Sequence, residues 1–395
     1  MKIVADSGIL GLAESAQHLA GSCDFVFESG RGLAPAQLHD AEALLVRSIT
    51  PVNAGLLEGS AVGFVGSATS GLDHIDSDYL DATGVHFAHA KGANAAAVVD
   101  YVFGVLALLS KETGREILGT TVGVVGRGCV GGLLDQTLQQ AGFSTRCCDA
   151  PLAALESGAR TLVSLDDALA CPIVCVHVPL SSMGSFPTRN LIGSVELKKM
   201  ASSAVLINPS RGGVVNEAAL KEHLSRSPNF IYAADVWMDE PRADPELVEA
   251  SWLATPHIAG YSVQAKQLAT SMLLTALSQY CASRKKIDIA QALNCAAEDC
   301  RIEGGQIQEV ALDPATDLSG RAVWAAVTRL LDLRAIDKKF RGALADGITA
   351  ESFDAQRKPL LKRQQLSLAR LRTYGLMLNE SERRLADALQ ITLLE

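Results

Sequence analysis

The sequence predicts an α/β protein built on doubly wound parallel β-sheets, and three observations support this. Short apolar runs alternate with helical patterns through most of the 395 residues, which is typical of parallel strands joined by crossover helices. A glycine-rich turn separates the run at residues 121–126 from a helical pattern. The chain is too long for one ordinary core, so more than one domain is expected.

The first part of the chain predicts one α/β layer. Strands are expected at residues 2–5, 43–46 and 62–66, with a helix around residues 35–41. A long helix follows Asn94, and its apolar run contains Asp100. An aspartate costs about 3 kcal/mol at a bilayer centre, and the run is shorter than the ~20 residues that a span needs. The run therefore predicts a buried helix.

A second series of elements follows, with a helix expected at 130–141 and strands expected at 121–126, 143–149, 173–177, 204–208 and 232–236. A helix over residues 265–282 could return to the first layer. Beyond residue 290, a strand near 306–312 precedes helical segments rich in Arg, Lys and Leu. A charged run is most often a solvated helix face, and this is the expectation for Arg357, Lys358, Lys362, Arg363, Arg370 and Arg372.

Composition excludes several classes of protein. A net charge of -9 and an aromatic content of 5% argue against nucleic-acid binding, which needs clustered cations and stacking surfaces. The nine cysteines form no CxxC pair and have no histidine partners at metal-ligand spacing, so neither a metal site nor a disulfide framework is expected. Free thiols and an N-terminus without a signal peptide predict a cytoplasmic protein.

The segment 126–131 fits the pattern G-x-G-x-x-G, between a predicted strand and a predicted helix. Asp149 ends the next predicted strand, where a carboxylate can accept hydrogen bonds from ribose hydroxyls. This context predicts a Rossmann-like dinucleotide site, with the pyrophosphate at the helix N-terminus. A 2′-phosphate would meet the charge of Asp149, so NAD is favoured over NADP; the alternative is a glycine turn without a ligand. Contacts are expected from Gly126, Gly128, Cys129, Val130, Gly131 and Asp149.

Two residues after later strands are candidates for acid–base and anion-binding roles. Arg211 follows the run 204–208, and its guanidinium offers two parallel donors to a carboxylate. His257 follows a short predicted strand, and an imidazole can accept and return a proton near neutral pH. The alternatives are a surface-paired or capping arginine and a packed histidine.

A carboxylate between these two could hold the imidazole in one tautomer. Glu240 is the candidate, although Asp239 and Asp244 are close in sequence. Asp235, at a strand end, could contact a nicotinamide amide or cap a turn.

Four segments together resemble the D-isomer-specific 2-hydroxyacid dehydrogenase family: GVVGRGCVGG, INPSRGGVVNEAAL, AADVWMDEP and TPHIAGYS. The resemblance implies two doubly wound domains, Rossmann-like and flavodoxin-like, and NAD-dependent oxidation of the C2 hydroxyl of a small anionic 2-hydroxy acid. It implies a catalytic set of Arg211, Glu240 and His257. It also implies cofactor contacts at Val178, Asp235 and Gly260, and substrate contacts at Ser48, Thr69 and Tyr261. Val178 stands where a threonine is usual, so that contact is lost or comes from the backbone.

The N-terminal segments LLVRSIT, GSATSGLDHID and NAAAVVDYVFG, with FDAQRKPLLKRQQLSLARL near the C-terminus, resemble the branch of the family that oxidises 4-phospho-D-erythronate in vitamin B6 biosynthesis. This resemblance implies a substrate domain (1–95 and 265–290), an NAD-binding domain (96–264) and a C-terminal α+β dimerisation domain (291–395) of a homodimer. The alternatives are another member, such as one acting on 3-phosphoglycerate, or an NAD-sensing corepressor or scaffold.

Overall fold

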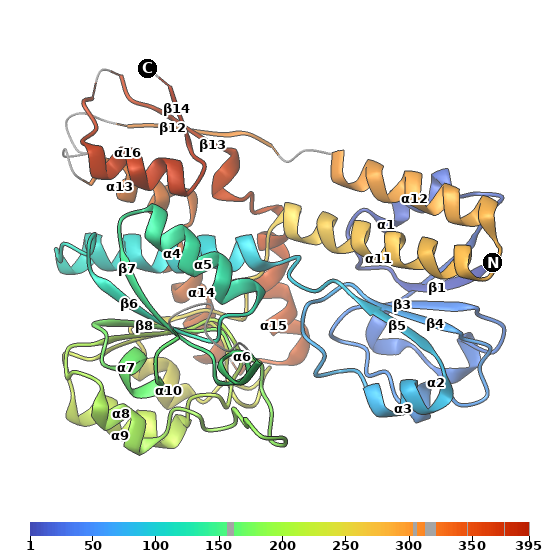
Figure 1. The fold of residues 1–395 in the computed structure, drawn as a ribbon, viewed down its shortest axis with the longest axis horizontal. Helices are drawn as coiled ribbons and strands as arrows, with labels where there is room; N and C mark the ends of the chain where they lie inside the picture. Colours follow the sequence, from blue (N-terminus) through green and yellow to red (C-terminus); the bar gives the residue numbers. More distant parts are fainter. Residues whose placement is uncertain (156–161, 303–305, 313–320, 346, 375, 395) are drawn as a thin grey trace. The chain divides into compact units, whose positions relative to one another are not determined.

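The computed structural model describes residues 1–155, 162–302, 306–312, 321–345, 347–374 and 376–394 (Figure 1). These residues form two compact units: residues 1–94 with 263–305, and residues 95–262 with 306–395. Every strand pairing within the three sheets is parallel. The predicted α/β class with parallel sheets is confirmed. The division into three domains stays a prediction.

The first unit has one five-stranded sheet in the order β2-β1-β3-β4-β5. Alternate residues of β1 and β3 enter two separate apolar clusters, one on each face of the sheet, as expected for strands buried on both sides. One cluster includes α11 and α12, which lie side by side (Figure 1), so the predicted return of the helix at 265–282 is confirmed. The elements are β1 (Lys2–Asp6), α1 (Leu12–His18), β2 (Asp24–Glu28), β3 (Ala43–Val46), α2 (Ala54–Leu57), β4 (Phe64–Ser67), α3 (Ser77–Thr83), β5 (His86–His89), α11 (Val263–Ser283) and α12 (Ile287–Ile302).

The second unit has a six-stranded sheet in the order β11-β10-β9-β8-β6-β7 and a three-stranded sheet in the order β12-β13-β14. The larger sheet comprises β6 (Thr121–Val125), β7 (Ser144–Cys148), β8 (Ile173–Val176), β9 (Val205–Asn208), β10 (Ile231–Ala234) and β11 (Leu253–Ala254). Its helices are α4 (Ala95–Thr113), α5 (Cys129–Gln140), α6 (Ala150–Leu155), α7 (Leu165–Leu169), α8 (Ser194–Lys199), α9 (Glu217–Arg226) and α10 (Pro245–Ala250). The first of these, α4, is buried along most of its length, as predicted. No helix of the described ranges is long and apolar enough to cross a membrane.

The C-terminal part packs into the same unit. It comprises β12 (Gln308–Ala311), α13 (Ala322–Leu330), α14 (Leu333–Ala345), α15 (Ala350–Arg357), β13 (Ala369–Arg372), α16 (Glu380–Ala388) and β14 (Thr392–Leu394). Phe340 and Phe353 join the apolar cluster beneath β8, β9 and β10, and Trp324 joins the cluster that contains α4. The segment therefore shares the core of the nucleotide-binding sheet.

Three local predictions were wrong or incomplete. The helix expected around 35–41 is only a 3₁₀ turn, Pro35–Gln37, because the chain must extend again to enter β3. Strands β2, β5, β13 and β14 were not predicted. The charges after residue 356 do not all lie on a solvated face: Lys358 and Lys362 are exposed, but the side chains of Arg357 and Arg363 are only 15% and 6% exposed.

The buried Arg363 explains how α4 tolerates its aspartate. Its Nη2 donates to Ala97 O at 2.7 Å and lies 3.8 Å from a carboxylate oxygen of Asp100. The same carboxylate accepts a hydrogen bond from the backbone of Leu366 at 3.0 Å. Burial raises the pKa of Asp100 to about 6, although Arg363 and this hydrogen bond oppose the shift.

Candidate active site

The glycine turn joins β6 to α5, and two of its glycines are required by geometry. Gly126 has φ 90°, and a Cβ there would lie 2.8 Å from Cγ1 of Val178. A Cβ on Gly131 would lie 1.8 Å from the carbonyl oxygen of Gly126. Any side chain at residue 131 would separate the helix from the turn, so close packing of α5 against the turn depends on this glycine.

Gly128 differs, because a Cβ at this position would meet no heavy atom within 4 Å. It is the N-cap residue of the 12-residue α5 and has no side chain to cap the helix. The first amide groups of α5 are thus left for a ligand, and a pyrophosphate is the group that such a helix terminus binds. The open space at Gly128 lets the backbone approach it. These residues fit NAD.

Asp149 lies beside this turn after β7. Its Oδ2 accepts a hydrogen bond from the backbone N–H of Arg127 at 2.7 Å, and its Oδ1 accepts one from Leu152 at 2.9 Å. The carboxylate is held next to the second residue of the turn. This is the position from which an acidic side chain can bind an adenosine ribose.

His177 and Val178 follow β8 and pack directly against Gly126. The Nε2 atom of His177 is buried without a hydrogen-bond partner among the described residues. Burial lowers the pKa of this imidazole to about 3, so His177 is neutral near pH 7.

His257 and Glu240 form a hydrogen-bonded pair. Nδ1 of His257 lies 2.7 Å from Oε2 of Glu240, and Oε1 of Glu240 accepts from the backbone N–H of Trp237 at 2.9 Å. Burial favours the protonated carboxyl, but the charge of His257 and these hydrogen bonds outweigh it, so the pKa of Glu240 is lowered. An ionised carboxylate facing Nδ1 fixes the tautomer and stabilises an imidazolium.

Asp244, one of the two acids close to Glu240 in sequence, has a different role. Asp244 caps α10 through the backbone N–H of Glu246 at 2.9 Å and pairs with Lys221 at 2.6 Å. Among these acids, Glu240 is the one that hydrogen-bonds the imidazole in the described part of the chain.

Asp235 is fully buried and binds the segment that carries His257. Its Oδ1 accepts from Thr255 Oγ1 at 2.6 Å and from Ile258 N at 2.8 Å, and its Oδ2 accepts from Ala259 N at 2.8 Å. Its backbone oxygen accepts from His257 N at 2.7 Å, while His257 has φ 55°. These bonds hold a left-handed backbone that a non-glycine residue rarely adopts. The sequence did not predict this supporting role, and the nicotinamide contact expected of Asp235 stays a prediction.

Arg211 lies on the loop after β9, against the segment that carries Glu240. A Cβ on the adjacent Gly212 would come within 2.0 Å of Trp237 O, so the two segments touch through their backbones. Asn208 braces the loop by donating to Arg211 O at 3.2 Å, and Nη1 of Arg211 donates to Ser210 O at 2.8 Å. The loops after β9, β10 and β11 thus meet at the carboxyl edge of adjacent strands, where open α/β sheets place their ligands.

The expected substrate contacts fall in both units. Ser48, exposed after β3, and Thr69 belong to the first unit; Oγ1 of Thr69 hydrogen-bonds Ser67 Oγ at 2.8 Å. Arg47 forms an ion pair with the buried Asp6, with 2.9 Å between Nε of Arg47 and Oδ2 of Asp6. Tyr261 and Gly260 follow His257 in the second unit, and Tyr261 N donates to Ile258 O at 2.8 Å.

One residue near this site was missed from the sequence. Arg357 lies over the ring of Tyr261, with 5.6 Å from its guanidinium carbon to the ring centroid. The basic run around it predicted a solvated face, and only its neighbour Phe353, in the same helix, signals that this helix has a buried side.

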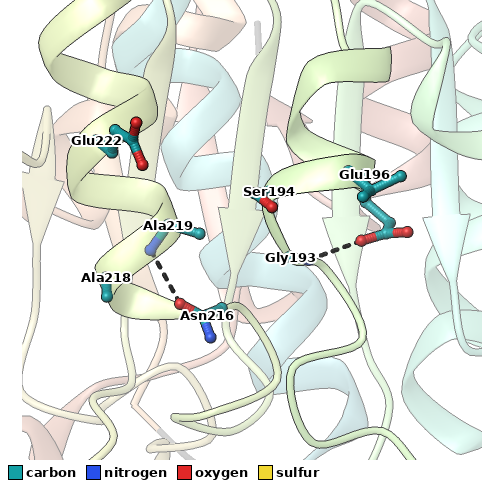
Figure 2. Close-up of a pocket in the computed structure, with 8 residues that line it drawn as sticks. Gly193, Ser194, Glu196, Asn216, Ala218, Ala219 and Glu222 are labelled. Carbon is teal, nitrogen blue, oxygen red and sulfur yellow. Dashed lines mark hydrogen bonds between the residues drawn. The ribbon is translucent and has the colours of Figure 1, made fainter.

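A pocket elsewhere in this unit is formed by the first turns of α8 and α9 (Figure 2). Its polar groups cap those helices: Gly193 N donates to Glu196 Oε2 at 3.0 Å, and Asn216 Oδ1 accepts from Ala219 N at 2.9 Å. No predicted catalytic, cofactor-binding or substrate-binding residue lines it, so the pocket is not the candidate active site.

Residues 104–259 match the D-isomer specific 2-hydroxyacid dehydrogenase, NAD binding domain. The chain belongs to this family of NAD-dependent dehydrogenases. It is 36% identical over 371 residues to the erythronate-4-phosphate dehydrogenase of Marinomonas sp. (strain MWYL1), which is 93% of each chain. It is 42% identical over 281 residues to the enzyme of that name from Hahella chejuensis, covering 71% of this chain and 72% of the relative.

Solved structures share the fold. The NAD⁺-bound 3-phosphoglycerate dehydrogenase of Entamoeba histolytica has a TM-score of 0.58 at 19% identity, covering 76% of this chain and 94% of that one. The NAD complex of formate dehydrogenase from Staphylococcus aureus has a TM-score of 0.57 at 20% identity, covering 71% and 95%.

Proposed function

We propose that this protein oxidises 4-phospho-D-erythronate at C2 to 2-oxo-3-hydroxy-4-phosphobutanoate, with NAD⁺ reduced to NADH, in the biosynthesis of pyridoxal 5′-phosphate. Relatives named erythronate-4-phosphate dehydrogenase match this sequence along nearly the whole chain. The observation that carries the chemistry is the His257–Glu240 pair, 2.7 Å apart, in the same unit as the glycine turn.

In this proposal, Arg211 binds the substrate carboxylate, because a planar guanidinium fixes the orientation of C2 through two parallel hydrogen bonds. His257 takes the proton of the C2 hydroxyl. Its Nδ1 is engaged by Glu240, so Nε2 is the nitrogen for the substrate, and the side chain is 34% exposed. Glu240 stabilises the imidazolium that forms. When bound, NAD supplies the acceptor for the hydride that leaves C2.

In this proposal, the glycine turn with Cys129 and Val130 binds the pyrophosphate, and Asp149 binds the adenosine ribose. Val178, Asp235 and Gly260 contact the nicotinamide side of the cofactor. Ser48, Thr69 and Tyr261 bind substrate oxygens. We also propose a cytoplasmic homodimer whose C-terminal region, residues 291–395, forms the interface. The nine cysteines form no disulfide in the part of the chain that the structure describes, which supports a reducing compartment.

The test is a turnover assay with the purified protein, NAD⁺ and a panel of 2-hydroxy acids that includes 4-phospho-D-erythronate and 3-phosphoglycerate. A parallel assay adds a 2-oxo acid and follows its reduction, because a protein that retains its cofactor between turnovers would release no NADH. NADH absorbance is expected to rise with 4-phospho-D-erythronate and to be lost in His257→Ala. Preference for 3-phosphoglycerate would contradict the proposed substrate, and no turnover of any acid would favour an NAD-sensing role.

A further inference from the structure

Arg357 ends α15 and reaches the site from the C-terminal part of the chain. Its guanidinium carbon lies 5.6 Å from the ring centroid of Tyr261 and 5.0 Å from that of Phe353. Such distances are within the range of attraction between a cation and an aromatic face. The guanidinium is therefore adjacent to the tyrosine that follows the His257 segment.

The charge of Arg357 interacts electrostatically with Glu240, the acid that pairs with His257. Burial works against the charged guanidinium, yet the pKa of Arg357 is raised because Tyr261, Asp354 and Glu240 favour the cation. In turn, Arg357 contributes to the lowered pKa of Glu240, after burial and the larger effects of His257 and Trp237. The cation is thus electrostatically coupled to the acid that supports His257.

The hydrogen bonds of this guanidinium are incomplete within the described protein. Nη2 pairs with Asp354, one turn earlier on α15, while the buried Nε has no acceptor. A buried donor without a partner is unfavourable, and more so when it is charged. A structural arginine that only tied α15 to the sheet would be expected to satisfy its donors with carbonyl oxygens, as Arg341 does with Val248 O and Ser251 O.

We propose that Arg357 binds the second anionic group of the substrate, the phosphate that Arg211 does not hold, beside Tyr261. This inference rests on the proposed function, since it requires a substrate with a carboxylate and a phosphate. An arriving phosphate oxygen would supply the missing acceptor, and the aromatic rings would limit how far the guanidinium can move. The C-terminal region would then determine substrate class as well as pack the sheet.

The first experiment compares kcat/KM for 4-phospho-D-erythronate and for D-erythronate, which lacks the phosphate. Lost charge-assisted hydrogen bonds are worth about 1.5–3 kcal/mol, or roughly 10- to 100-fold. In Arg357→Met, the loss for the phosphorylated substrate is expected to exceed the loss for D-erythronate by at least about tenfold, through KM rather than kcat. Arg357→Lys keeps the charge and is expected to recover part of the loss.

Arg372→Met is the matched control. Arg372 lies on β13, is 44% exposed and pairs with Glu309 at 3.1 Å. The same substitution there should leave kcat/KM for both substrates unchanged. Equal losses for both substrates in Arg357→Met, or a loss confined to kcat, would overturn the inference and show a positioning role.

A second experiment does not depend on turnover. Binding of inorganic phosphate to the NAD-loaded protein is measured by calorimetry for the unmodified chain, Arg357→Met, Arg357→Lys and Arg372→Met. Phosphate affinity is expected to fall by about tenfold or more in Arg357→Met alone. Equal affinity in Arg357→Met and the unmodified chain refutes the inference, whereas turnover of a different acid by the unmodified chain contradicts only the proposed substrate.

Discussion

Substituting alanine for each of two glycines in the turn at residues 126–131 should impair two different properties: stability and NAD binding. In Gly131→Ala, the new methyl would lie 1.8 Å from Gly126 O, whereas an unstrained contact needs roughly 3.5 Å. The atoms to be displaced are backbone, so the variant should lose about 3 kcal/mol of unfolding free energy, the upper end of overpacking costs.

In Gly128→Ala, the methyl meets no protein atom within 4 Å, and φ of -70° suits alanine. Alanine is a poorer N-cap than glycine, so a loss of at most about 1 kcal/mol is expected. The methyl does occupy the space proposed for the pyrophosphate. A clash of about 1–3 kcal/mol there would weaken NAD binding roughly 5- to 150-fold.

Urea unfolding without cofactor and NAD titration by calorimetry separate the two effects. Gly131→Ala should be defective in the first measurement, and Gly128→Ala mainly in the second. NAD affinity in Gly128→Ala equal to that of the unmodified protein would refute the placement of the pyrophosphate at α5. Unchanged stability of Gly131→Ala would refute the packing argument.

Three further predictions concern single side chains. His257→Ala should lower kcat by about 10²–10⁴, the range for a lost general base. Glu240→Gln should lower kcat at least about tenfold, because the imidazolium loses its charged partner. Steady-state rates of both variants near those of the unmodified enzyme would contradict the assigned chemistry. Asp149→Ala should raise the ratio of kcat/KM for NADP to that for NAD, because a 2′-phosphate would no longer meet a carboxylate; a preference for NADP in the unmodified enzyme would argue against this role. For Asp100, whose pKa is raised to about 6 by burial, the folded state holds its proton more tightly than the unfolded state, so this group's contribution to stability falls between about pH 4 and pH 6. Between pH 4 and pH 7, the unfolding free energy of Asp100→Asn should therefore rise by up to about 3 kcal/mol relative to that of the unmodified protein. If the difference between their urea-derived unfolding free energies did not change with pH, burial would not raise the pKa of this carboxyl.

Much of the fold could be predicted because its signals are local. The apolar runs that became β3, β6, β8 and β9 are bounded by turn residues next to them in the chain. The glycine turn depends on atoms only a few residues apart, such as Gly126 and Gly131. Strands β13 and β14 were missed because they are short and partly exposed, and because the run rich in Arg, Lys and Leu around β13 predicted helical segments.

The sequence by itself determined the order of the catalytic candidates: an arginine, an acid and a histidine, each following a strand. Only the tertiary structure shows which contacts these acids make: α10 takes Asp244 as its cap, and His257 pairs with Glu240. It also decided that Arg357 is buried beside Tyr261. The physical reason is that backbone geometry is encoded by neighbouring residues, whereas the partner of a charge depends on which distant segments the folded core brings into contact.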